Sequence, residues 1–404
     1  MAVHPPMASP PKLPQAVLAL GLTSFLTDAG SEMIFPLLPA FVASLGAGPA
    51  FLGLIEGVAE AVASTLKLVS GYLAERTRSE KAFVVFGYSL AALVRPLVAL
   101  ATAPWHVLAI RVSDRVGKGM RSAPRDALLS ASVSKEHSGR AFGFHRAMDH
   151  AGAVVGPLVA TALLALGLPL RHVFAAAVVP GILSVIVVAT VRAPATKKKE
   201  WVAPKESNAP GKLHDTRFFP SYLAILLFFS LGGSSDAFLL LRSKELGVPV
   251  HAIPMLWAAF HVSKVLAARM GGTLADRFSR PKVIVAGWCI YGATYLAFGF
   301  GNRAWHAWVL LVLYGASSAL AEPAEKALVK DLVPAGHAGR GFGLYNFVLG
   351  ISAIPAGLLT GWLWKWGAGV ALGTCAGFAF VAAGALFVWD ARRMALLASK
   401  SDRR

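Results

Sequence analysis

One segment carries an unusually charged face for its length. Its ionisable residues recur at helical spacing and comprise Arg111, Asp114, Arg115, Lys118, Arg121, Arg125 and Asp126. At 100° per residue, all of them fall within an arc of about 140°. Charges inside a membrane-spanning helix are costly, so they usually face one another or a water-filled cavity. The size of this set favours a polar cavity.

Shorter polar stripes occur on neighbouring segments. Asp28 and Glu32 are one helical turn apart, and a carboxyl in such a place can exchange protons while a nearby cation responds to its charge. We therefore predict proton coupling by Asp28, Glu32, Arg111 and Arg115. The remaining stripe residues are predicted to line a substrate cavity, and they are Glu56, Glu60, Lys67, Asp114, Lys118, Arg146 and Asp149.

Two other interpretations of these residues are simpler. The stripes could be ion pairs that hold helices together, with Arg95 or Lys67 paired to an acid on a neighbouring helix. His145 and Asp149 are also one turn apart, but without a third ligand they favour a helix contact over a metal site. No phosphate-binding loop, dinucleotide glycine pattern or nucleophile elbow occurs, so we expect no cofactor, no metal and no enzymatic activity.

The composition places these stripes in a bilayer. Of 404 residues, 56% are apolar and 15% charged, with a mean hydropathy of +0.60. Crossing roughly 30 Å of hydrocarbon takes about 20 residues. Runs of this kind start near Gln15, Ala50, Ala82, Trp105, Gly139, Arg171, Phe218, Pro249, Lys282, Trp305, Gly339 and Gly367. We predict an all-α integral membrane protein with twelve transmembrane helices. The helix near Trp105 would fail a hydropathy scan by itself.

The net charge of +18 is distributed unevenly between the loops. Most basic residues outside the predicted spans follow even-numbered helices, whereas the alternate loops carry few. This asymmetry predicts that both termini lie in the cytoplasm. Binding to nucleic acid is not expected, because no basic patch interleaves with aromatic residues outside the spans.

The chain also repeats itself. Gly139-Arg-Ala-Phe-Gly-Phe144 recurs 200 positions later as Gly339-Arg-Gly-Phe-Gly-Leu344, and Gly71-Tyr-Leu-Ala-Glu-Arg76 recurs as Gly272-Thr-Leu-Ala-Asp-Arg277. A repeat of this length is typical of paired transporter halves. We predict a disordered N-terminus (1–14), a six-helix half (15–192), a basic cytoplasmic linker (193–217), a pseudo-symmetric six-helix half (218–390) and a cytoplasmic tail (391–404).

The second of these repeats resembles a family signature. Gly272 to Lys282, with its copy at 71–81, is similar to the loop after the second helix of the major facilitator superfamily, although Arg78 and Glu80 depart from the pattern. The resemblance implies secondary transport by alternating access. It also implies that an acid and arginines at these helix ends latch one conformation. The implied latch residues are Gly71, Glu75, Arg76, Gly272, Asp276, Arg277 and Arg280.

Two further motifs are similar to the same family. Arg115 to Gly119 matches its helix 4 signature loosely, with Lys118 replacing a glutamine. Gly152 to Pro157 is similar to the glycine-proline motif of its antiporters, and we expect Gly152, Gly156 and Pro157 to form a tight hinge. The block from Asp114 to Asp126 resembles a bacterial branch of the family.

These features together predict a monomeric, proton-coupled transporter of a bacterial inner membrane. The helix that starts near Trp105 has five basic and two acidic residues, which favours an anionic or zwitterionic solute. The glycine-proline motif favours export. Uptake of an organic anion by symport remains the alternative, and a polytopic membrane enzyme or a receptor without transport activity is a further one. The expected partners are the solute, protons and the lipid bilayer.

Overall fold

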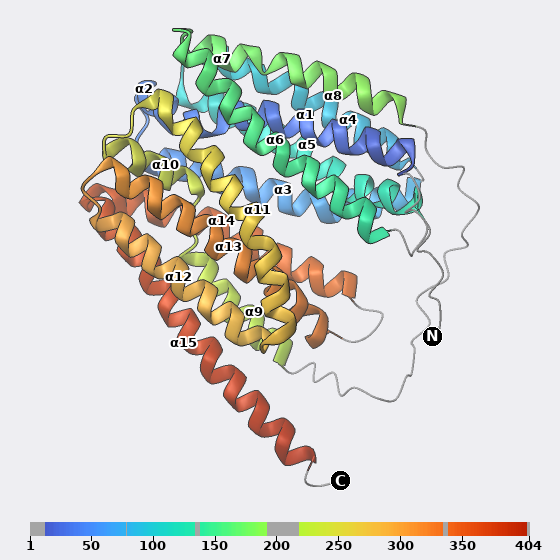
Figure 1. Cartoon of the computed structure of the whole chain (residues 1–404), viewed down its shortest axis with the longest axis vertical. Helices are drawn as coiled ribbons and strands as arrows, with labels where there is room; N and C mark the ends of the chain where they lie inside the picture. Colours follow the sequence, from blue (N-terminus) through green and yellow to red (C-terminus); the bar gives the residue numbers. More distant parts are fainter. Residues whose placement is uncertain (1–12, 78, 134–137, 192–217, 334–337, 402–404) are drawn as a thin grey trace, which may run out of the picture.

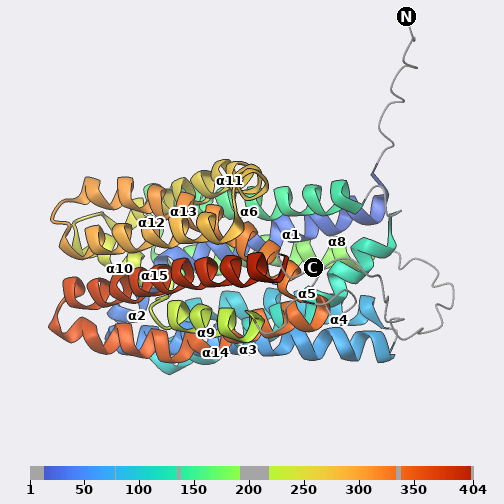
Figure 2. The same ribbon diagram turned by 90° about the horizontal axis from the view of Figure 1, so that it is seen from below.

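The computed structural model describes residues 13–77, 79–133, 138–191, 218–333 and 338–401. Within these ranges the chain forms helices and no strand, and the helices run back and forth between two ends of the molecule (Figure 2). The N-terminal half consists of α1 (Gln15–Ile34), η1 (Phe35–Leu37), α2 (Leu38–Ser44), α3 (Pro49–Thr77), α4 (Glu80–Val94), η2 (Arg95–Leu100), α5 (Pro104–Ala131), α6 (Ser138–Ala165), α7 (Leu170–Ala176) and α8 (Val178–Thr190).

The C-terminal half repeats this order of long and broken segments. It consists of α9 (Phe218–Leu231), α10 (Asp236–Glu245), η4 (Val250–Ala252), α11 (Ile253–Arg277), α12 (Arg280–Phe300), α13 (Ala304–Leu332), α14 (Ala338–Leu363), η5 (Trp364–Trp366) and α15 (Ala368–Ser401). Joined pieces such as α1–η1–α2, α7–α8 and α9–α10 each complete one crossing. The described helices therefore agree with the twelve predicted spans. The last helix continues past residue 390, where the sequence suggested that a tail begins.

The helices meet at two ends of the molecule that have different connections. The short-loop end carries the turns 45–48 and 246–249, in which Gly46 and Gly247 adopt φ of 85° and 93°. Such left-handed conformations suit glycine at the end of a helix. The linker end is the opposite end, where α8 ends at Thr190 and α9 begins at Phe218.

Hydropathy sets two helices with polar stripes, α3 and α5, apart from the others. Among the described residues, ten segments are long and apolar enough to cross a membrane, and α3 and α5 are not among them. The sequence predicted this failure for α5. Many large apolar side chains point outward, including Leu93 and Leu166, which are 71% and 77% exposed. A surface of this kind suits lipid, so α3 and α5 must be sheltered by the other helices.

The two halves meet along α3 and α14, along α6 and α11, and through α2 and α10 at the short-loop end. Apolar packing also crosses the boundary at that end, because Phe35 and Leu52 join the core of the C-terminal half. Toward the linker end, α12 and α15 run away from the N-terminal half (Figure 1). The structure is therefore closed at the short-loop end.

Glycines allow α3 and α14 to approach closely. A Cβ atom added at Gly53 would collide with the carbonyl oxygen of Gly357, and one added at Gly57 would lie 2.8 Å from the carbonyl oxygen of Ala353. Backbones that pack this tightly leave no room for a larger side chain.

We expect Gly53→Leu to open the short-loop end. Forcing a large side chain into a packed interface costs about 1–3 kcal/mol, which shifts a conformational equilibrium by roughly tenfold or more. Spin labels at the exposed positions Ala43 and Lys244, on α2 and α10, should then report a longer distance. Gly377→Leu is the matched control because its added side chain points into open space. An unchanged distance in Gly53→Leu would contradict the expected role of this contact.

Candidate functional site

Two buried ion pairs fix the charged face of α5 against its neighbours. Arg111 binds the Glu56 carboxylate with two guanidinium nitrogens, at 2.8–3.0 Å. Arg95 donates to Asp114 at 2.7 Å and to the carbonyl oxygen of Thr27 at 2.7 Å. All four charged side chains are at most 8% exposed. Part of the stripe therefore holds α3, η2 and α5 together, as the simpler interpretation of the sequence anticipated.

Another member of the stripe, Arg115, faces a cavity of about 350 Å³ between the halves. Arg115 lines it from α5, and Glu56 and Glu60 line it from α3. The C-terminal half contributes Asp236 and several serines of the α9–α10 break. The Nε atom of Arg115 is buried without a hydrogen-bond partner in the described part of the chain.

Neighbouring charges surround this cavity. Glu60 accepts a hydrogen bond from Ser64 at 3.3 Å and interacts electrostatically with Lys118, Arg115 and Lys67. Asp114 is 1% exposed and lies away from the cavity beside Arg95. Of the seven predicted cavity residues, Glu56 and Glu60 line this space, whereas Lys67, Asp114, Lys118, Arg146 and Asp149 do not.

The two acids of α1 have different surroundings. Glu32 reaches across the boundary between the halves, where it accepts a hydrogen bond from the indole nitrogen of Trp257 at 2.7 Å. His261 lies 3.9 Å from the same carboxylate oxygen. Asp28 interacts electrostatically with Asp149 and Lys118. The structure therefore does not bring Arg111 to either acid, since Arg111 is occupied by Glu56.

The predicted residues of α6, Arg146 and Asp149, also differ in their surroundings. The Nδ1 atom of His145 lies 3.6 Å from Asp149, and the His145 Nε2 and Asp149 Oδ1 atoms are buried without hydrogen-bond partners. Arg146 is exposed. Among the described residues, no three histidine, cysteine or acidic side chains gather into a possible metal site.

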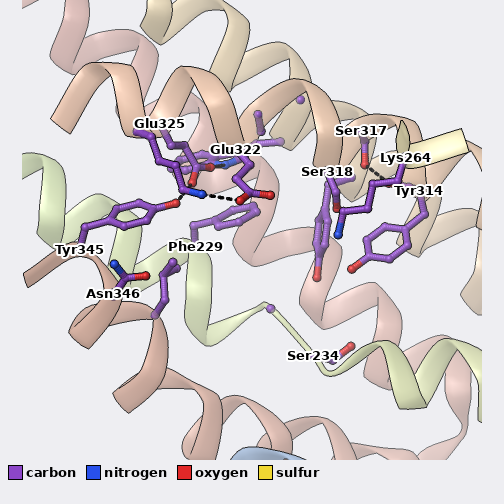
Figure 3. Close-up of a pocket in the computed structure, with 17 residues that line it drawn as sticks. Phe229, Ser234, Lys264, Tyr314, Ser317, Ser318, Glu322, Glu325, Tyr345 and Asn346 are labelled. Carbon is purple, nitrogen blue, oxygen red and sulfur yellow. Dashed lines mark hydrogen bonds and ion pairs between the residues drawn. The ribbon is translucent and has the colours of Figure 1, made fainter. Parts of the chain in front are cut away.

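Sequence reasoning missed a second cavity, of about 320 Å³, inside the C-terminal half (Figure 3). Its buried Glu325 accepts hydrogen bonds from the Trp288 indole at 2.8 Å and the Tyr345 hydroxyl at 2.7 Å. Lys326 pairs with Glu322 at 2.6 Å, one turn away on α13. Its other lining residues include the aromatic Phe229, Tyr291 and Tyr314, the small polar Ser317 and Ser318, and a further cation, Lys264.

Asp236 was missed as well, although the sequence around it contains a signal. It follows Gly232-Gly233-Ser234-Ser235, and the structure breaks the seventh segment between Leu231 and Asp236 at this run. Interrupted helices of this kind mark binding sites in transporters. The Tyr314 hydroxyl donates to Asp236 at 2.5 Å.

The predicted hinge and latch residues lie on helix contacts and at the linker end. A Cβ atom at Gly152 or Gly156 would collide with the backbone of α1, so α6 packs closely there, and Pro157 lies inside the same helix.

Among the predicted latch residues, Gly71 faces Ala123 of α5, and Arg76 is exposed. The Glu75 side chain and the Asp276 and Arg277 side chains, with the surroundings of Gly272, lie outside the described residues. Arg280 forms an ion pair with Asp331 and donates to the carbonyl oxygen of Ala327 at 3.0 Å.

Comparison with known proteins adds independent information. The family model of the Major Facilitator Superfamily matches residues 20–242 and 221–402. An uncharacterized MFS-type transporter of Methanocaldococcus jannaschii is 31% identical over 363 residues, which cover 88% of this chain and 89% of that protein. A multidrug resistance protein of Cronobacter sakazakii is 26% identical over 354 residues, or 86% of each chain.

Solved structures share the fold at low sequence identity. A nucleoside transporter structure superposes with a TM-score of 0.75 at 16% identity, covering 93% of this chain and 98% of that one. A bacterial homologue of the human lysosomal transporter Spinster, in an inward-facing conformation, gives a TM-score of 0.72 at 16% identity, covering 93% and 96%. At this level of identity, the likeness concerns the fold alone.

Proposed function

This chain belongs to the major facilitator superfamily, and from that premise we propose that it exports a small solute in exchange for protons by alternating access. The single observation that supports this most is the 350 Å³ cavity, because charged residues of both halves line it. Arg115 and Glu60 come from the N-terminal half, and Asp236 comes from the C-terminal half. Movement of one half against the other would therefore change the relative positions of these residues and the side of the membrane from which the cavity is open.

In this proposal, Asp28 and Glu32 take up the proton. Both lie on α1 near cations of α5, since Arg115 and Lys118 interact electrostatically with Glu32, and Lys118 also with Asp28. Two neighbouring acids share their protonation steps, so the titration belongs to the pair. Arg115 is the cation of α5 that responds, because Arg111 is held by Glu56.

Export is favoured by two observations. The close packing of Gly152 and Gly156 against α1 fits the antiporter motif that the sequence resembles. The relative from Cronobacter sakazakii carries the name of a multidrug resistance protein. The alternative is uptake of an organic anion with protons, which the five basic residues of α5 favour.

The proposed setting is a bacterial inner membrane that contains the protein as a monomer with both termini in the cytoplasm. The segment 193–217 then links the halves on the cytoplasmic side, and the closed short-loop end faces outward. In this orientation the structure is an inward-open form. Arg280, paired with Asp331 at this end, would belong to a cytoplasmic latch.

We expect cysteines at the two ends to react differently in whole cells. In a background without Cys289 and Cys375, a membrane-impermeant thiol reagent should label Gly48→Cys at the short-loop end. It should not label Ser207→Cys in the linker until the cells are opened. Labelling of Ser207→Cys in intact cells would reverse the proposed orientation.

The proposed activity can be tested in proteoliposomes that contain a trapped pH-sensitive dye. Zwitterionic, anionic and cationic solutes are added outside in turn, and the internal pH is recorded. Antiport predicts that a transported solute makes the lumen alkaline, because protons leave as the solute enters. Acidification would instead favour the uptake symporter. If no solute class moved protons beyond the level of protein-free vesicles, the proposal of proton-coupled transport would be wrong.

A further inference from the structure

The two cavities are adjoining parts of one binding region. Both are lined by Phe229, Gly233, Ser234 and Leu349, so the break between α9 and α10 forms their common wall. We name the 350 Å³ cavity between the halves the charged arm, and the 320 Å³ cavity within the C-terminal half the aromatic arm. Each volume lies at the lower end of the range for small-molecule sites, so a ligand that occupies both arms is of drug or metabolite size.

Arg115 gives the charged arm a cation that requires an acceptor. Its Nε atom is buried without a hydrogen-bond partner in the described part of the chain, although acids are near. Glu56 is oriented toward Arg111, with both carboxylate oxygens bound by that guanidinium. A buried donor without a partner is costly, and a guanidinium fits a carboxylate with two parallel hydrogen bonds. This end of the region therefore suits an acidic group of a ligand.

Asp236 provides the opposite chemistry in the same arm. Its carboxylate accepts a hydrogen bond from the Tyr314 hydroxyl, and no cation lies within ion-pair distance in the described residues. The rings of Tyr291, Tyr295 and Tyr314 form a cluster beside it, with centroids 4.2–5.8 Å apart. A carboxylate without an ion-pair partner suits an ammonium group, which it binds through a charged hydrogen bond.

The charges around the charged arm balance. After removal of the two internal ion pairs, Arg111–Glu56 and Arg95–Asp114, the groups that interact electrostatically around this arm are five cations and five acids. They are Lys67, Arg115, Lys118, Arg121 and Lys264, and Asp28, Glu32, Glu60, Asp149 and Asp236. A region with no net charge but separated positive and negative sites favours a dipolar ligand over a simple anion or cation.

The aromatic arm suits an apolar or aromatic body. Phe229 and Trp288 stack with centroids 4.2 Å apart at 7°, and Tyr345 and Leu349 extend this surface. Stacked rings bury large apolar areas and prefer planar partners. Three charged groups of this arm have partners within it, since Glu325 is bound by Trp288 and Tyr345, and Glu322 is paired with Lys326. The fourth, Lys264, has its Nζ atom 5.5 Å from the centroid of the Phe260 ring.

From these contacts we infer that the solute is an aromatic zwitterion that places its acidic group at Arg115, its amino group at Asp236 and its ring in the aromatic arm. This inference rests on the proposed transport function and specifies its substrate class. It also predicts which half recognises which part of the ligand. The N-terminal half binds the acid, and the C-terminal half binds the amine and the ring.

Four matched compounds test the inference on the purified full-length protein. Phenylalanine presents the whole ligand, and its methyl ester masks the acidic group. N-acetylphenylalanine masks the amino group, and alanine lacks the ring. Competition with radiolabelled phenylalanine gives relative affinities. We expect phenylalanine to bind about tenfold to a hundredfold more tightly than each of the others, because each lacks a charged hydrogen bond or the buried ring.

Two variants assign the groups. Arg115→Gln should remove the preference for phenylalanine over its methyl ester while keeping the preference over N-acetylphenylalanine. Asp236→Asn should do the reverse. Asp126→Asn is the control, because Asp126 is half exposed, pairs with Arg125 and lines neither arm, and it should keep both preferences. Size-exclusion profiles identify any variant that does not fold. If Arg115→Gln does not fold, Arg115→Lys is used in its place, and we expect it to lose part of the same preference.

Three results would overturn the inference. They are equal binding of phenylalanine, its ester and its acetyl derivative, absence of binding by all four compounds, and loss of both preferences in the Asp126→Asn control alone. None of them bears on proton coupling, which the dye-loaded proteoliposomes measure separately. If the protein moves protons with another class of solute but fails this binding test, the proposed function stands and the proposed substrate class is wrong.

Discussion

Arg111→Leu should lower the free energy of unfolding by about 3–5 kcal/mol, because it leaves the buried Glu56 carboxylate without its counter-ion. The Arg111 and Glu56 side chains are 6% and 8% exposed, so water cannot replace the lost partner easily. The remaining acid would also repel Asp114, which lies 3.9 Å from Arg111 in the same network. Denaturation of the purified protein in detergent, followed by circular dichroism, measures the loss.

A double-mutant cycle separates the ion pair from simple loss of packing. Glu56→Gln combined with Arg111→Leu should be more stable than Arg111→Leu alone, since the unpaired charge is then absent. Arg146→Leu is the matched control because Arg146 is exposed, and such surface changes usually stay within about 0.5 kcal/mol. Additive effects of the two buried substitutions would mean that the pair does not act as a unit.

Asp28→Asn should abolish transport driven by a pH gradient while leaving part of the exchange of solute across the membrane. Exchange requires the binding region and the movement of the halves, but no net movement of protons. Asp28 is suited to this role because it interacts electrostatically with Asp149 of α6 and Lys118 of α5. Flux of a solute identified in the dye assay, measured with and without a pH gradient, separates the two activities.

The controls for this variant use other acids. Asp126→Asn should keep gradient-driven transport, because Asp126 is half exposed and paired with Arg125 at 3.0 Å. Glu32→Gln should also lose coupling, and in addition it weakens the contact to Trp257 that joins the halves. Full gradient-driven transport in both Asp28→Asn and Glu32→Gln would place the proton site elsewhere, with Asp149 and Glu56 as the next candidates.

Sequence patterns predicted the fold well because they report on single helices and on the repeat. The family, the all-helical fold and the low hydropathy of α5 are all confirmed. A charged face is visible from periodicity alone, since every member of the stripe shares one helix. The break at Gly232 to Ser235 could also have been read from its small residues, although the sequence analysis overlooked it.

The partners of these charges could not be predicted in the same way. Periodicity indicates that Arg111 and Arg115 share a face, but not that a small rotation directs one to Glu56 and leaves the other in the cavity. The bond from Trp257 to Glu32 joins residues 225 positions apart, so it depends on how the halves pack. Single acids such as Asp236 and Glu325 form no stripe, and only the folded structure groups them with their tyrosine and tryptophan donors.

Alternating access is the central claim, and distances at the two ends of the molecule test it most directly. Spin labels at Ala43 and Lys244 report on the short-loop end, and labels at Thr77 and Lys330 report on the linker end. All four positions are exposed. We predict opposite changes, so that conditions that lengthen the first distance shorten the second, with Gly53→Leu favouring the state open at the short-loop end. Two distances that stay fixed, or that lengthen together, under every condition of pH and added solute would contradict the account.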